Sequence, residues 1–140
     1  MIQVIACAYG GAGFESCFDI RLRVFVQEQN VPPEEERDAL DEEAGHFLAL
    51  WSCEAAGTAR AIIKSPGLVK IGRVAVLAPY RRFGIGAALM RAIEAAHPGA
   101  AFVVDSQLHA LQFYERLGYV AEGEVFDEAG IPHRTMRKGL

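Results

Sequence analysis

The stretch that decides the fold runs from Val74 to Gly86 and reads VAVLAPYRRFGIG. It begins as an apolar strand pattern, breaks at a proline, and passes through two arginines and two glycines into 87–96, a segment of strong helix formers. A strand that enters a helix through glycines leaves several backbone N–H groups unpaired at one point, and the helix dipole adds partial positive charge there. The stretch therefore predicts a site for a phosphate or pyrophosphate.

The same residues exclude two common phosphate-binding motifs. A P-loop needs GxxxxGK[ST], and this stretch lacks the lysine and the hydroxyl. The dinucleotide motif GxGxxG fails because Leu89 stands where the third glycine is required. A plain tight turn is the structural alternative, but it leaves the adjacent Arg81 and Arg82 unexplained.

Around this stretch, apolar residues recur at strand and helix spacing along the chain. We expect strands at 1–6, 46–54, 58–65, 68–77, 101–105, 119–126 and 133–138, and helices at 14–28, after Pro33, at 87–96 and at 109–117. A tight turn is expected at 55–57, a loop at 127–132, and a helix end at Gly118. The pattern predicts one α+β domain over 1–140, an α/β sandwich whose mixed, mostly antiparallel sheet of about six to seven strands is flanked by about four helices.

The charge of the chain is concentrated in one place. With 140 residues, 51% of them hydrophobic, the chain can build one core, and its formal charge is −4. The segment 34–43 carries seven carboxylates against one arginine, so the rest of the chain is slightly basic. Those basic residues are scattered, which disfavours a nucleic-acid partner. We expect the acidic run to form a solvated face at the start of a short helix.

Neither a membrane nor a metal is expected. No apolar stretch approaches the roughly 20 residues of a membrane span, and the first residues do not resemble a signal peptide, so a cytoplasmic protein is predicted. Cys7, Cys17 and Cys53 are odd in number and lack CxxC spacing. They are predicted to be buried thiols rather than disulfide partners or metal ligands.

Two motifs resemble the GCN5-related N-acetyltransferase (GNAT) family. Arg81–Gly86 (RRFGIG) fits the family signature [Q/R]xxGx[G/A] at every fixed position, and 113–119 (FYERLGY) is similar to a second family motif. The expected order of strands and helices also fits, so the resemblance covers essentially the whole chain. Residues 24–32 (VFVQEQNVP) and 128–133 (EAGIPH) resemble a subgroup of small bacterial proteins similar to ElaA and YjcF.

The resemblance implies transfer of the acetyl group of acetyl-CoA to a primary amine of a small molecule or peptide, by direct attack in a ternary complex. It implies that the backbone of Arg82–Ala87 holds the pyrophosphate and that Val74–Val76 pairs with the pantetheine arm like an added strand. The N–H of Val76, or of its neighbour, would polarise the thioester carbonyl, and Tyr114 would protonate the leaving thiolate or stabilise it by a hydrogen bond. The implied cofactor-binding set is Val74, Ala75, Val76, Arg81, Arg82, Phe83, Gly84, Ile85, Gly86, Ala87, Gln107 and Tyr114.

The general base is left open by the sequence. The stretch 70–73 offers no carboxylate where many members of the family carry one, so His109, Glu28, His133 and a water chain are alternatives. The acidic run is a second candidate feature of the acceptor side, because it could steer a cationic amine. Glu28, Asp38, Asp41 and His133 are therefore the expected acceptor contacts.

A second function class is kept beside the enzyme. A CoA-binding regulatory or interaction module that has lost catalysis is favoured by the missing carboxylate and disfavoured by Tyr114. The resemblance also makes a homodimer an expectation, because members of the family are frequently dimers.

Overall fold

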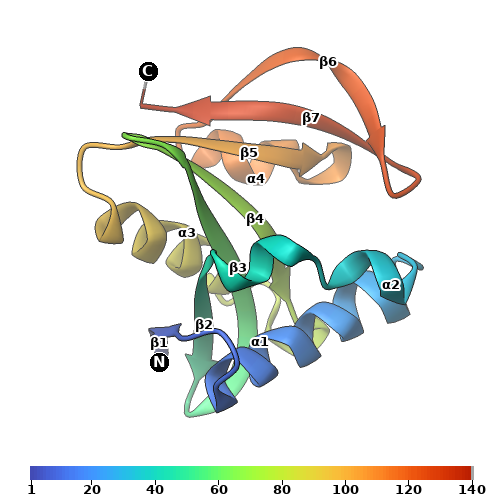
Figure 1. The fold of residues 1–140 in the computed structure, drawn as a ribbon, viewed down its shortest axis with the longest axis vertical. Coiled ribbons are helices and arrows are strands. Elements are labelled where there is room, and N and C mark those ends of the chain that lie inside the picture. Colours follow the sequence, from blue (N-terminus) through green and yellow to red (C-terminus); the bar gives the residue numbers. More distant parts are fainter. Residues whose placement is uncertain (140) are drawn as a thin grey trace.

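Seven strands form one sheet in the computed structural model, which describes residues 1–139 (Figure 1). The strands are β1 (Ile2–Cys7), β2 (Gly45–Trp51), β3 (Glu54–Ser65), β4 (Leu68–Val76), β5 (Ala101–Gln107), β6 (Val120–Glu128) and β7 (Ile131–Lys138). Their order across the sheet is β1-β2-β3-β4-β5-β7-β6, and β4 with β5 is the one parallel pair among the described strands. The mixed, mostly antiparallel α+β fold predicted from the sequence is confirmed.

Helices cover both faces of this sheet (Figure 1). The helices are α1 (Ala12–Arg21), which continues into a π-helical segment (Leu22–Glu28), α2 (Pro33–Glu36) followed by a 3-10 turn (Ala39–Glu42), α3 (Ile85–Ala96), and α4 (Leu111–Arg116). One apolar cluster packs α1 against one face of the sheet, and a larger cluster packs α3 and α4 against the opposite face. Because successive side chains of a strand point to opposite faces of the sheet, strands β1 to β4 contribute residues to both clusters. No helix among residues 1–139 is both long and apolar enough to span a membrane.

β4 and β5 separate half-way along the sheet, which is the feature that positions the site. They pair only from Leu68–Ile71 to Ala101–Val104, and β5 continues alongside β7 while β4 stays with β3. Figure 1 shows the two strands diverging beyond this pairing. β4 also carries a bulge. Gly72 pairs with Arg60 and Ala75 pairs with Thr58, so β4 has one more residue than β3 between these two pairs. Arg73 lies in this bulge with φ of 52°, a left-handed backbone conformation.

The hairpin between β2 and β3 turns earlier than the sequence predicted. Ser52 and Cys53 form the turn, both with positive φ, and residues 55–57 belong to β3. Gly57 lies within β3 and is required by close packing, not by a turn. A Cβ at this position would lie 2.8 Å from Cγ2 of Ile85 and 3.0 Å from O of Ala75. Cys53 is consequently exposed, so the prediction of a buried thiol is wrong for it, whereas Cys17 is buried as expected.

The last two strands and helix α4 follow the sequence closely. Gly118 has φ of 96° and follows Leu117, the C-cap residue of α4, which confirms the predicted helix end. The loop expected at 127–132 is shorter than predicted, since β6 and β7 remain paired up to Glu128 and Ile131. The chain reverses there through Ala129 and Gly130, both with positive φ.

Substitution of Gly57 tests whether α3 needs a bare backbone on β3. We expect Gly57→Ala to lower the free energy of unfolding by about 1–3 kcal/mol, because the new methyl group overpacks the contact with Ile85. Urea unfolding measures it. Gly45→Ala is the matched control, since its Cβ would make only ordinary contacts at 3.6 and 3.8 Å. Equal stability of the two variants would contradict the packing explanation.

Candidate functional site

A cleft of about 930 Å³ opens between the separated halves of β4 and β5. It is bounded by the π-helical segment, the start of α3, α4 and the β6–β7 turn. Most of the residues singled out in the sequence line it: Val74, Ala75, Val76, Arg81, Arg82, Gly84, Ile85, Gly86, Ala87, Gln107, His109, Tyr114, Glu28, Asp38 and His133. Phe83 and Asp41 lie outside the lining. Phe83 packs instead on Trp51, with ring centroids 4.7 Å apart.

The loop before α3 has the backbone shape of an anion site. Arg82 and Gly84 have φ of 76° and 82°, and a left-handed non-glycine residue such as Arg82 costs about 1 kcal/mol or more. Alternating handedness of this kind turns N–H groups toward a common point. No side chain among residues 1–139 caps the N-terminus of α3, so its first N–H groups are open to a ligand. Gly86 lets α3 approach α4, because a Cβ there would lie 2.9 Å from Cζ of Phe113.

The free edge of β4 presents the Val76 peptide to the cleft. The N–H of Leu77 points toward β3 and donates to O of Ala56 at 2.9 Å. Because successive N–H groups of a strand point to opposite sides, the N–H of Val76 points away from β3, toward the cleft. The carbonyl of Val76 points the same way and accepts from Nε of Arg81 at 2.8 Å. Its N–H is therefore placed to bind a carbonyl oxygen in the cleft.

The walls of the cleft are tied together by side chains of the π-helical segment and the residue after it. Arg81 donates to both carboxylate oxygens of Glu28, at 2.7 and 2.9 Å. Gln29 and Gln107 exchange two amide hydrogen bonds, of 2.7 and 3.3 Å, and Nε2 of His109 lies 2.5 Å from Oε1 of Gln107. The side chains of Arg81 and Gln107 are thus hydrogen-bonded to other residues of the protein. A ligand can contact them only through donor or acceptor atoms that these hydrogen bonds leave free, or by replacing one of the hydrogen bonds.

Tyr114 of α4 lines the cleft. Its side chain is 6% exposed, and burial raises the pKa of its phenol well above the usual value. Burial is the one cause of this shift, and no hydrogen bond of the Tyr114 hydroxyl is found among residues 1–139. A neutral phenol that lines a cleft with its hydroxyl unengaged can donate a proton or a hydrogen bond to a bound group.

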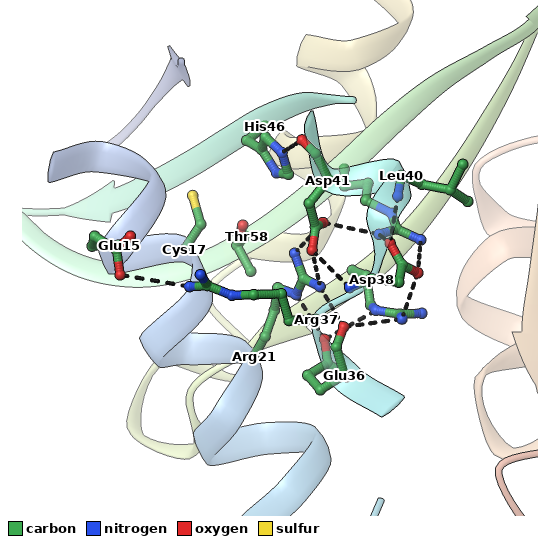
Figure 2. Close-up of polar contacts among 12 residues, drawn as sticks. Glu15, Cys17, Arg21, Glu36, Arg37, Asp38, Leu40, Asp41, His46 and Thr58 are labelled. Carbon is green, nitrogen blue, oxygen red and sulfur yellow. Dashed lines mark hydrogen bonds and ion pairs between the residues drawn. The ribbon is translucent and has the colours of Figure 1, made fainter. Parts of the chain in front are cut away.

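A buried cluster of arginines and carboxylates closes the other side of the cleft (Figure 2). Arg21 of α1 binds Glu36 at 2.7 Å and Asp41 at 2.8 Å. Arg60 of β3 binds Asp38 at 2.8 Å and Asp41 at 2.9 Å. Arg73 adds Glu36, at 3.0 Å, and Asp38, at 3.2 Å. We call Arg21, Glu36, Asp38, Asp41, Arg60 and Arg73 the arginine–carboxylate cluster; its formal charges cancel.

This cluster corrects two expectations about the acidic run. The predicted solvated face is wrong for Glu36 and Asp41, whose side chains are buried. Asp41 is also wrong as an acceptor contact, because Arg21, Arg60 and the N–H of Asp38 surround its carboxylate. Asp38 does line the cleft, but two arginines balance its charge, so it cannot steer a cation by itself. The segment bends over the sheet to pair with arginines that the sequence places in three separate elements.

Comparison with known proteins identifies the family. The model of the acetyltransferase (GNAT) domain family matches residues 7–140. The chain belongs to the GNAT family. The uncharacterized N-acetyltransferase YjcF of Bacillus subtilis is 40% identical over 128 residues, which are 89% of this chain and 91% of that protein. ElaA of Escherichia coli is 32% identical over 126 residues, 85% of this chain and 82% of that protein, and its crystal structure covers 99% of both chains with a TM-score of 0.83.

A solved acyl-CoA N-acyltransferase from Pseudomonas aeruginosa also resembles the whole chain. It is 28% identical, covers 99% of both chains and has a TM-score of 0.83. These similarities confirm the GNAT fold and the resemblance to the ElaA and YjcF subgroup. In this GNAT protein, Arg81–Gly86 spans the loop before α3 and the first two residues of that helix, and Phe113–Tyr119 spans the last four residues of α4 and the chain that follows.

Sequence reasoning missed the three arginines of the cluster. Arg21, Arg60 and Arg73 lie within apolar helix or strand patterns, where an unpaired charge would be costly to bury. Arginines in apolar patterns, together with the seven carboxylates of 34–43, could have indicated buried ion pairs. The pairing itself depends on how the chain returns over the sheet, which no local pattern encodes. Among residues 1–139, no three His, Cys, Asp or Glu side chains are arranged so that they could hold a metal ion.

Asp41 makes the stability of the chain depend on pH in the acid range. Burial acts to raise the pKa of its carboxyl, but hydrogen bonds from Arg21 and Arg60, together with the charge of Arg21, outweigh it and lower the pKa from 3.8 to about 2. A lowered pKa stabilises the folded state above the unfolded pKa, and this contribution is lost as the pH falls toward 2. We expect it to amount to about 2 kcal/mol, measured by urea unfolding at a series of pH values.

The variant Asp41→Asn should be less stable than the parent near neutral pH and should lose less stability on acidification. Asp19→Asn is the control, because Asp19 is exposed and forms only a surface pair with Arg23. An acid profile of Asp41→Asn with the same slope as the parent would show that Asp41 does not carry the effect.

Proposed function

We propose that this GNAT protein is an acetyl-CoA-dependent N-acetyltransferase that acts on a primary amine of a small molecule or peptide by direct attack in a ternary complex. The observation that carries the proposal is the Val76 N–H, which faces the same cleft as the anion-binding loop and the Tyr114 phenol. A thioester needs a binding site for its anionic tail, a donor to its carbonyl and a donor to its leaving sulfur. The cleft supplies one group for each.

The residues divide these tasks along the cleft. N–H groups of Arg82–Ala87 hold the pyrophosphate at the start of α3, with the guanidinium of Arg82 beside it. The open edge of β4 between Val74 and Val76 accepts the pantetheine arm as an added strand. Acetyl-CoA supplies an activated acetyl group whose leaving group is a thiolate. The family membership and the name of the P. aeruginosa acyl-CoA N-acyltransferase support an acyl-CoA as the donor.

Bond changes in the reaction assign roles to two groups already described. The lone pair of the neutral amine forms a C–N bond with the acetyl carbon, and the C–S bond breaks. The N–H of Val76 stabilises the charge on the carbonyl oxygen; removal of such a donor costs about 2.7–4 kcal/mol in other enzymes. Tyr114 donates its phenolic proton to the departing thiolate, and the proton that the nitrogen loses as the amide forms returns to Tyr114 through water.

A CoA-binding module without catalysis is the second candidate. The observation that favours it is Arg73, which occupies the β4 bulge with its side chain bound to Glu36 and Asp38, so this position of β4 supplies no base. The two candidates share the ligand and differ in turnover. They can therefore be separated by one pair of measurements.

Binding and turnover should both be found. Acetyl-CoA at about 100 times its Kd should stabilise the chain by about 2.7 kcal/mol, seen as a rise in Tm, because it binds only the folded state. NAD, which has a pyrophosphate but no pantetheine arm, is the control and should give a smaller rise. Thiol release with a panel of primary amines then tests the activity. A rise in Tm without thiol release for any amine would favour the module.

Exchange of Tyr114 for phenylalanine tests the proton donor. We expect Tyr114→Phe to keep the Kd for acetyl-CoA and to lower kcat by about 10²-fold or more, because the ring still fills its place while the proton is lost. Tyr9→Phe is the matched control, since Tyr9 is exposed and lies outside the cleft. An unchanged kcat in Tyr114→Phe would remove Tyr114 from the mechanism.

A further inference from the structure

His133 of β7 lies on the wall of the cleft opposite β4. It pairs across the sheet with Gln107, and two residues further on Thr135 pairs with Asp105, to which its hydroxyl donates at 2.8 Å. Directly paired residues share a face of a sheet, whereas the next residue, Met136, packs in the α3 and α4 core. His133 therefore faces the α1 side of the sheet. It lines the same cleft as Val76 and Tyr114 while only 6% exposed.

One ring nitrogen of His133 is fixed as a donor. Nδ1 lies 2.7 Å from the carbonyl oxygen of Ile131, and because a carbonyl can only accept, the proton of the neutral ring is on Nδ1. Nε2 then carries the lone pair. It makes no hydrogen bond to residues 1–139, and the carboxylate in ion-pair range of it there is Glu128, with Oε2 at 3.9 Å. The ring of Phe126 stacks beside the imidazole at 5.9 Å and holds its plane.

Two other carboxylates that line the cleft, Glu28 and Asp105, are already engaged. Arg81 binds both oxygens of Glu28, and Lys70 lies 2.9 Å from Oδ2 of Asp105, whose other oxygen accepts from Thr135. Nε2 of His109 donates to Oε1 of Gln107, because an amide oxygen can only accept, so the lone pair of this exposed ring is on Nδ1. Of the two histidines that the sequence left open as bases, His133 is the buried one, and it has the carboxylate of Glu128 beside its acceptor nitrogen.

We propose that Nε2 of His133 is the general base that deprotonates the acceptor amine, and that Glu128 passes the proton to solvent. This assignment rests on the proposed acetyltransferase function. One proton leaves the ammonium group for Nε2 and frees the lone pair that attacks the acetyl carbon. The second leaves the nitrogen as the amide forms and balances the proton that Tyr114 gives to the thiolate. The imidazolium returns its proton to Glu128, whose side chain is 55% exposed.

Charges around His133 favour this cycle. Glu128 of β6 faces Nε2, and Asp105 of β5 interacts electrostatically with the ring, while Lys70 of β4 balances Asp105. His109 lies beyond Gln107 on the same wall. A carboxylate beside Nε2 stabilises the imidazolium formed after proton transfer. The same carboxylate at the mouth of the cleft also attracts a cationic acceptor.

The experiment compares His133→Asn with the parent, using the most active amine of the panel. The asparagine amide can still donate to O of Ile131, so the β6–β7 turn is retained, but no base is present. We expect the kcat/KM for the amine to fall about 10²–10³-fold with an unchanged Kd for acetyl-CoA. Added imidazole should restore part of the rate, which loss of a merely structural residue would not allow. Unchanged kcat/KM in His133→Asn would overturn the assignment.

Glu128→Gln gives an independent test that does not disturb a buried residue. We expect a smaller loss of kcat than in His133→Asn, with Glu124→Gln, an exposed carboxylate of the same strand, as the matched control. Equal rates for Glu128→Gln and Glu124→Gln would remove the relay to Glu128. A parent protein that binds acetyl-CoA but acetylates no amine would instead reject the proposed function, and the base with it.

Discussion

The separation of β4 from β5 is the constraint on which the rest of the structure depends. Parallel strands normally satisfy each other's backbone groups along their whole length, and here the pairing ends at Ile71 and Val104. β5 recovers its partners from β7, whereas β4 keeps β3 on one side and leaves its other edge open. An unpaired edge inside a molecule is costly unless something binds it. The cleft is therefore a consequence of the sheet, and in the proposed function the pantetheine arm of acetyl-CoA pairs with this open edge.

The bulge at Arg73 connects this opening to the arginine–carboxylate cluster. Its left-handed backbone is unfavourable for a non-glycine residue, and the side chain is held by Glu36 and Asp38. The same carboxylates are fixed by Arg21 of α1 and Arg60 of β3. Removing one partner from such a buried set leaves a charge without compensation, which is far more destabilising than loss of a surface pair. The cluster thus links the helix layer to the strand that carries Val76.

Much of this arrangement could be predicted from local sequence, because the relevant signals are local. The strand, glycine loop and helix around Arg81–Gly86 depend on residue types at fixed spacing, and so does the end of α4 at Gly118. The turn at Ser52–Cys53 escaped prediction because neither residue favours positive φ, and tertiary pairing imposes it. The burial of Asp41 escaped because its arginine partners lie 20 and 19 residues away along the chain. Likewise, the open lone pair of His133 is visible only once its neighbours are placed.

The contact between Phe83 and Trp51 gives the chain an optical property. Trp51 is its single tryptophan, and the ring of Phe83 lies against it at 4.7 Å. Phe83 belongs to the loop whose N–H groups face the cleft, between the left-handed residues Arg82 and Gly84. A change in the backbone of that loop therefore alters the surroundings of one indole. The intrinsic fluorescence of the unlabelled protein reports on the loop without interference from a second tryptophan.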